Sequence, residues 1–263
     1  MNIPDIRLGT SGWKYDDWKG VFLPSKPTDE LAAYARVFDT VEIDSTWYHT
    51  PARRVVESWR RRVPDDFRFA AKVPRAITHD KNLIDCEGEL SAFLDAMSAL
   101  EDKLGPILFQ FPPDWTARQG EESLRDFLPL LPQDWKFAVE FRHESWFSDR
   151  IAELLRLHSV AWTLADFGHF VPQVYVTAPF SYVRWLGNRH EPLEPLNSIK
   201  KDRASEEEQW AQVIADLPVR EVWGFFNNHW AGYSPGSAQG FRQRLGLAAR
   251  ELPPEEPVQG TLF

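Results

Sequence analysis

Eight short apolar segments, rich in β-branched and aromatic residues, alternate along this chain with stretches of helical spacing. In the helical stretches apolar residues recur on one face, as in Val55, Val56, Trp59 and Val63, a pattern typical of helices that cover a sheet. Strands and helices in alternation predict a parallel sheet with the helices outside it. The predicted strands are "IRLGT" (6–10), "TVEIDS" (40–45), "RFAAKV" (68–73), "PILFQF" (106–111), "KFAVEFR" (136–142), "AWTLAD" (161–166), "SYVRWLG" (181–187) and "EVWGFFNN" (221–228).

Length favours a barrel over an open sheet. The chain has 263 residues, close to the roughly 250 residues of a TIM or (β/α)8 barrel, which needs the same eight units. No linker-like composition divides residues 1–250, so we expect one α/β barrel domain there, with no convincing helix in 167–179. Residues 251–263, "ELPPEEPVQGTLF", are acidic and proline-rich and predict a short disordered tail.

Composition and missing motifs exclude several functions. The net charge of −9 argues against a sequence-wide coating of nucleic acid phosphates. The single cysteine, Cys86, excludes an intramolecular disulfide. There is no nucleotide-binding glycine motif or serine-nucleophile elbow, so we expect no nucleotide cofactor. No signal peptide or membrane-length apolar run is present, and we expect a cytoplasmic protein without membrane contact.

Polar residues stand at the ends of seven predicted strands, where the apolar interior of a barrel should stop. Active sites of TIM barrels lie at the carboxyl ends of the strands, so we expect these side chains to form one site. Its expected catalytic residues are Glu42, Glu140 and Asp166. The residues expected to bind substrate around them are Trp13, Tyr15, Asp44, Trp47, Lys72, Gln110, Arg142, His143, Arg184, Asn227, Asn228 and His229.

Carboxylates and arginines favour phosphate chemistry. Arginine binds phosphate through paired hydrogen bonds, so the leading hypothesis is hydrolysis of a phosphate ester, which includes nucleic acid, with Arg142 and Arg184 holding the phosphate. Glu140 or Asp166 would then act as a base or as a metal ligand. A divalent cation such as Mg²⁺ or Mn²⁺ would suit the four acids Glu42, Asp44, Glu140 and Asp166.

Three alternatives remain open. A glycoside hydrolase would use Glu42 and Glu140 as facing carboxylates, with tryptophans stacked on sugar rings. A non-catalytic protein would use the same pocket only to bind an anionic ligand. A purely structural role is the third, in which Glu42, Lys72, Glu140, Arg142 and Arg184 neutralise one another as buried ion pairs.

Long motifs in this chain resemble the DUF72 family, also called YecE-like proteins. The motifs are "GTSGWKYDDWKGVFLP", "FDTVEIDSTWYHTP", "AKVPRAITHDKNL", "LGPILFQFPPDW", "AVEFRHESWF", "YVRWLG" and "FFNNHWAGYSPGSA". The resemblance extends over residues 7–245. The resemblance implies a TIM barrel, distantly similar to endonuclease IV and xylose isomerase, and no established activity. Two positions depart from the family pattern. Asp44 replaces the usual asparagine, and Leu186 stands where the family has a histidine, so an activity that needs that histidine would be lost here.

The last five residues, "QGTLF", resemble the short motif by which bacterial replication and repair proteins bind the sliding clamp. A flexible tail can insert Leu262 and Phe263 into an apolar cleft while Gln259 makes polar contacts. We therefore expect a sliding clamp as a candidate partner, which would support a DNA-processing role. The alternatives are that the pair covers an apolar patch of the barrel or that the match is accidental.

Overall fold

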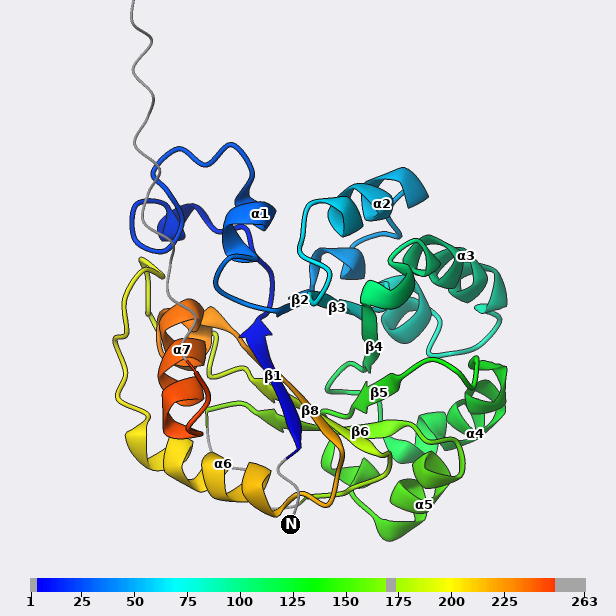
Figure 1. Cartoon of the computed structure of the whole chain (residues 1–263). Coiled ribbons are helices and arrows are strands. Elements are labelled where there is room, and N and C mark those ends of the chain that lie inside the picture. The colour runs from blue at the N-terminus through cyan, green and yellow to red at the C-terminus, as the bar shows by residue number, and fades with distance from the viewer. Residues whose placement is uncertain (1–3, 169–173, 249–263) are drawn as a thin grey trace, which may run out of the picture.

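All eight predicted strands are present and pair in parallel. The structure, a computed structural model, describes residues 4–168 and 174–248. In these residues the strands form one sheet in the order β1-β8-β7-β6-β5-β4-β3-β2 (Figure 1), which confirms the TIM-barrel prediction. The strands are β1 (Asp5–Thr10), β2 (Thr40–Ile43), β3 (Arg68–Lys72), β4 (Leu104–Gln110), β5 (Phe137–Glu140), β6 (Ala161–Asp166), β7 (Phe180–Trp185) and β8 (Glu221–Phe226).

The barrel is nearly closed. The first and last strands lie side by side, as expected, and pair from Asp5↔Glu221 to Thr10↔Phe226. β1 and β2 pair over a much shorter length. In the described residues, the single bridge Ser11↔Glu42 joins them. Gly9 allows the close approach there, because a Cβ at this position would lie 2.2 Å from the carbonyl oxygen of Thr40.

The helices surround the strands on the outside (Figure 1). They are α1 (Glu30–Tyr34), α2 (Arg53–Arg61), α3 (Glu87–Ser98), α4 (Ala117–Phe127), α5 (Asp149–Leu157), α6 (Ala204–Asp216) and α7 (Ser234–Arg244). The described part of 167–179 contains no helix, in agreement with the sequence pattern. None of the helices in residues 4–168 and 174–248 is long and apolar enough to span a lipid bilayer.

Large and small side chains fill the inside of the barrel in complementary positions. Phe180 and Tyr182 from β7 and Trp223 and Phe225 from β8 are the large ones. Small residues from the other strands face them, which lets the interior reach close packing. The small residues that the other strands contribute to this cluster are Ala70, Ala138 and Ala161.

Several strands end one or two residues earlier than their apolar patterns predict. Asp44 and Asn227 come directly after β2 and β8, and Arg142 is the second residue after β5. Their side chains are therefore placed by loops at the carboxyl end of the barrel, where TIM barrels carry their sites. The predicted tail, 251–263, with Gln259, Leu262 and Phe263, lies outside the described residues.

Candidate functional site

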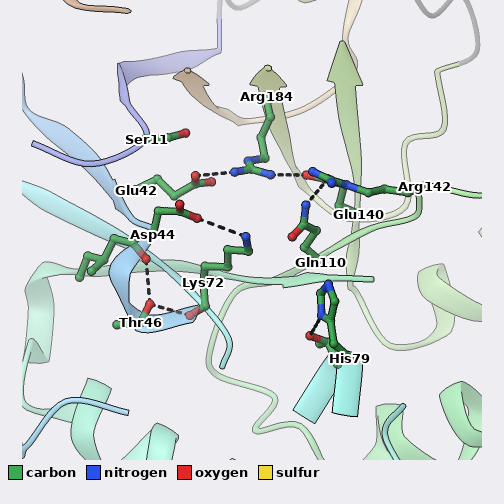
Figure 2. Close-up of polar contacts among 12 residues, drawn as sticks. Ser11, Glu42, Asp44, Thr46, Lys72, His79, Gln110, Glu140, Arg142 and Arg184 are labelled. Carbon is green, nitrogen blue, oxygen red and sulfur yellow. Dashed lines mark hydrogen bonds and ion pairs between the residues drawn. The ribbon is translucent and has the colours of Figure 1, made fainter. Parts of the chain in front are cut away.

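A buried ion triad lies at the carboxyl end of the barrel. Arg184 of β7 stands between Glu42 of β2 and Glu140 of β5 (Figure 2). Its Nη2 lies 2.8 Å from Oε1 of Glu42, and its Nη1 lies 2.6 Å from Oε2 of Glu140. Both carboxylates are fully buried and Arg184 is 2% exposed. Alternation along the strands causes this: Arg184 is two residues after Tyr182, which faces the barrel interior.

Further donors complete the hydrogen bonding of the two carboxylates. The Tyr182 hydroxyl donates to Glu42 at 2.7 Å. Arg142 Nε and Gln110 Nε2 donate to Glu140 Oε1 at 2.7 and 3.0 Å. A buried charge is tolerated when it is paired and hydrogen-bonded in this way. For the triad, the structure therefore matches the alternative of a buried salt-bridge network.

The pKa of Glu140 reflects these partners. Burial by itself would raise it, but the charges and hydrogen bonds of Arg184 and Arg142 outweigh burial and hold the pKa of Glu140 well below its usual range. Burial and the neighbouring Glu42 charge raise the pKa of Tyr182 well above its usual value. Glu140 therefore stays ionised at neutral pH, and it is unsuited to donate a proton as a general acid.

A second charged pair lies beside the triad. Lys72, at the end of β3, has its Nζ 3.2 Å from Oδ1 of Asp44 and 5.0 Å from the ring centre of Trp47. The Thr46 hydroxyl holds the local turn by donating to the carbonyl oxygens of Ile43 and Lys72. Burial lowers the pKa of Lys72, and the Asp44 charge only partly offsets it. Among the described residues, the ion pair with Asp44 is the polar contact of Lys72 Nζ, which leaves the ammonium group with further donors.

His79 also belongs to this group, although a lone histidine in a sequence is a weak indication of a functional residue. It lies on a π-helical turn, Ala76–Asp80, a feature frequent at functional sites. Its ring points toward Gln110 and Glu140 (Figure 2) and packs edge-on against Trp47. Burial, with the charges of Lys72 and Arg142, lowers the pKa of His79 to about 4. The imidazole is therefore neutral at pH 7.

The structure does not bring Asp166 into the cluster. The Asp166 carboxylate accepts hydrogen bonds from the backbone N–H of Gly168 and from the indole of Trp210 on α6, each at 2.8 Å. Asp166 pairs with Trp185 in the sheet, and both side chains face the helices outside the barrel. Successive residues of a strand point to opposite faces. Asp166 therefore points away from the barrel interior and from the charged cluster.

Other predicted residues hold loops at the same end of the barrel. The His143 ring accepts a hydrogen bond from the N–H of Ser145 and caps a 3-10 turn. Asn228 Oδ1 accepts from the indole of Trp18 and from Ser234 at the start of α7. The remaining two residues of the β8 loop lie together, because Asn227 Oδ1 accepts from the N–H of His229.

Two aromatic residues expected at the rim, Trp13 and Tyr15, have different surroundings. Trp13 packs edge-on against Trp59 of α2. The Tyr15 hydroxyl donates to the carbonyl oxygen of Ser11 at 2.8 Å. Burial and the charges of Asp44 and Glu42 raise the pKa of Tyr15, which places this phenol beside the charged cluster.

The geometry does not fit the expected divalent metal site. Of the proposed ligands, Glu42 and Glu140 are bonded to Arg184, Asp44 pairs with Lys72 and Asp166 faces the helices. Within residues 4–168 and 174–248, no three His, Cys, Asp or Glu side chains form a group that could hold a metal ion.

The glycoside hydrolase alternative meets a similar obstacle. Its two carboxylates must leave room for a sugar or a water between them. Here the Arg184 guanidinium fills the space between Glu42 and Glu140, and Glu140 is held ionised. The pair therefore does not fit an acid–nucleophile couple.

Eight parallel strands with helices outside them define a TIM-barrel protein, and the charged cluster lies at the carboxyl ends of the strands. Comparison with known proteins then identifies its family. The model for "Protein of unknown function DUF72" matches residues 7–261, and the chain belongs to this family.

Its relatives agree with this assignment. The UPF0759 protein YunF of Bacillus subtilis (strain 168) is 29% identical over 281 residues, which cover 94% of this chain and 99% of that protein. The UPF0759 protein YecE of Escherichia coli (strain K12) is 34% identical over 143 residues, so the match spans 54% of this chain and half, 50%, of YecE. A crystal structure of a DUF72 family protein from Thermotoga maritima MSB8 has a TM-score of 0.80 at 29% identity and covers 92% of this chain and 99% of that one.

Proposed function

We propose that the mouth of the barrel binds a small phosphate-bearing ligand through Lys72 and Arg142. One observation carries this: the buried carboxylates already share Arg184, whereas Lys72 and Arg142 each keep donors without a partner among the described residues. Gln110 of β4 lies on the strand between those that position the two cations. A lysine point charge beside an arginine fork suits the oxygens of a phosphate.

Two substitutions of opposite expected effect test the proposal. Lys72→Met keeps the length of the side chain and removes the charge, so we expect affinity for inorganic phosphate and ribose 5-phosphate to fall at least about tenfold. Asp44→Asn removes the carboxylate that competes with phosphate for Lys72, and we expect affinity to rise several-fold. Isothermal titration calorimetry at low salt measures both.

The matched control is Lys81→Met, which removes a partly exposed lysine paired with Glu89 at 2.7 Å and should leave affinity unchanged. Malonate, a dicarboxylate of similar charge, is titrated in parallel so that the affinities for carboxylate and phosphate can be compared. An unchanged affinity in Lys72→Met, or no phosphate binding by the unmodified protein at about 10 mM, would contradict the proposal.

Hydrolysis of the bound ester is a second candidate because the neutral His79 ring packs against Trp47, which Lys72 also contacts. A neutral imidazole at this position can orient a water molecule by a hydrogen bond. Phosphorus NMR of the same samples distinguishes the two. Inorganic phosphate released by the unmodified protein but not by His79→Asn would add catalysis to binding. Ligand recovered unchanged would leave a binding protein.

The sliding clamp is a separate proposal that depends on Gln259, Leu262 and Phe263 alone. We expect a peptide of residues 252–263 to bind purified clamp with a dissociation constant on the order of micromolar. Fluorescence anisotropy should show that Leu262→Ala with Phe263→Ala abolishes binding, because the apolar anchors are lost. Absence of binding at several hundred micromolar (roughly −5 kcal/mol) would remove the case for DNA processing.

A further inference from the structure

The barrel wall opens between β5 and β6 at the end where the site lies. These strands pair only at Ala138↔Ala161 and Val139↔Trp162, whereas β5 pairs with β4 as far as Gln110↔Glu140. Beyond Val139 and Trp162 the two strands therefore separate. Residues that follow β5 and residues of β6 line a pocket at this point.

This pocket is lined by aromatic rings. Its rings are Phe141, Phe147, Trp162, Phe167 and Trp210. Trp162 is held from two sides, with Phe141 at 5.0 Å and Phe147 at 5.3 Å between ring centres. Phe141, Trp162 and Trp210 are buried and form the fixed floor of the pocket. Phe147 and Phe167 are partly exposed, so they are the rings on which a planar ligand can stack.

Two polar residues of the pocket lining, Thr163 and Glu144, can form hydrogen bonds with a ligand. Thr163 is 4% exposed and lines the pocket, and its hydroxyl has no hydrogen-bond partner among the described residues. A buried hydroxyl without a partner costs free energy, which a polar atom of a ligand would recover. Glu144 lines the same pocket and can accept a hydrogen bond from an amino group.

Arg142 links this pocket to the anion site. Its Nε is bonded to Glu140 at 2.7 Å, its guanidinium lies 5.2 Å from the ring centre of Phe167, and it lines the pocket. A ligand with its phosphate on Arg142 would therefore have the aromatic pocket directly beside it.

We propose that this pocket binds the heteroaromatic base of a mononucleotide whose phosphate occupies the site of Lys72 and Arg142. The inference rests on the proposed phosphate binding and extends it with a binding site for the base of the same ligand. Stacking supplies most of the affinity for the base, and Thr163 and Glu144 give it hydrogen bonds.

Calorimetry on the full chain compares AMP, GMP, CMP and UMP with ribose 5-phosphate, which shares the sugar phosphate and lacks the base. At least one mononucleotide should bind about tenfold more tightly than ribose 5-phosphate. Phe167→Leu and Thr163→Val should each reduce this ratio several-fold and leave the affinity for ribose 5-phosphate unchanged. Thr40→Val is the matched control, because Thr40 also has a buried hydroxyl without a partner in the described residues but lies on β2; it should leave the ratio unchanged.

The outcomes separate the two proposals. Equal affinities for all mononucleotides and ribose 5-phosphate would overturn the ring pocket and leave phosphate binding intact. Binding of adenosine, with no binding of ribose 5-phosphate or inorganic phosphate, would overturn the anion site and support the ring pocket. Absence of binding by every one of these probes would overturn both.

Discussion

Arg184→Met is expected to lower the free energy of unfolding by about 4 kcal/mol, because it leaves two buried carboxylates without their shared cation. Glu42 and Glu140 are both fully buried and bonded to this one guanidinium. Methionine has a similar length, so lost packing contributes little. Urea denaturation measures the change, and the thermal midpoint should fall by roughly 10 °C.

The loss should also depend on pH. Without Arg184, only Arg142 opposes the effect of burial on Glu140, so the pKa of Glu140 in the folded state rises. The folded variant then binds more protons than the folded unmodified protein, and the variant loses stability relative to it as pH rises. The deficit should therefore be larger at pH 8 than at pH 5. Adding Glu42→Gln and Glu140→Gln to the variant should restore part of the stability, because it removes the uncompensated charges.

The matched control is Arg125→Met, which removes an exposed arginine paired with Glu121 at 2.7 Å. Exposed pairs contribute about 0–1 kcal/mol, so the control should change stability little. If both variants lose the same small amount, the triad does not stabilise the barrel in the way the geometry indicates.

Glu140→Gln is the second large effect, with an expected loss of about 3 kcal/mol at pH 7. The substitution keeps the volume but leaves Arg184 and Arg142 with too little negative charge around them. The sequence by itself suggests a milder effect, with ligand binding lost and the fold retained. The structure changes that expectation, because every oxygen of this carboxylate is bonded within the barrel.

The pH dependence of this loss has a definite sign. The folded-state pKa of Glu140 lies below its ordinary value of 4.5, so its contribution is complete above pH 4.5 and is lost as pH falls from there toward the lowered pKa. The difference in stability between the unmodified protein and Glu140→Gln should therefore shrink below pH 4.5. Chemical denaturation between pH 3 and pH 7 (roughly the window set by carboxyl titration) measures it.

A surface carboxylate with two arginines provides the control. Glu121 pairs with Arg125 and Arg150, and Glu121→Gln should cost less than about 1 kcal/mol because water screens the charges. A constant difference between Glu140→Gln and the unmodified protein across this pH range would contradict the lowered pKa of Glu140.

The sequence by itself determined the fold and the end of the barrel that carries the site. Eight apolar segments alternate with stretches of helical spacing, which predicts eight parallel strands with the helices outside them. Charged residues near the end of such a segment lie beyond the apolar layers of the barrel. The sequence therefore places Glu42, Lys72, Glu140 and Arg184 at the carboxyl end. Local pattern suffices for these conclusions, since both depend on residues that are near in the chain.

Only the tertiary structure decided which of these groups meet. Glu42 and Arg184 are 142 positions apart, and no local pattern shows that one guanidinium bonds two glutamates. Asp166 has the same position at a strand end, yet the alternation of β6 turns it toward Trp210. His79 is a weak signal in the sequence as a lone histidine, and a π-helical turn brings it against Trp47, which Lys72 also contacts. Strand alternation, loop geometry and long-range pairing set the direction of each side chain, and these are properties of the folded barrel.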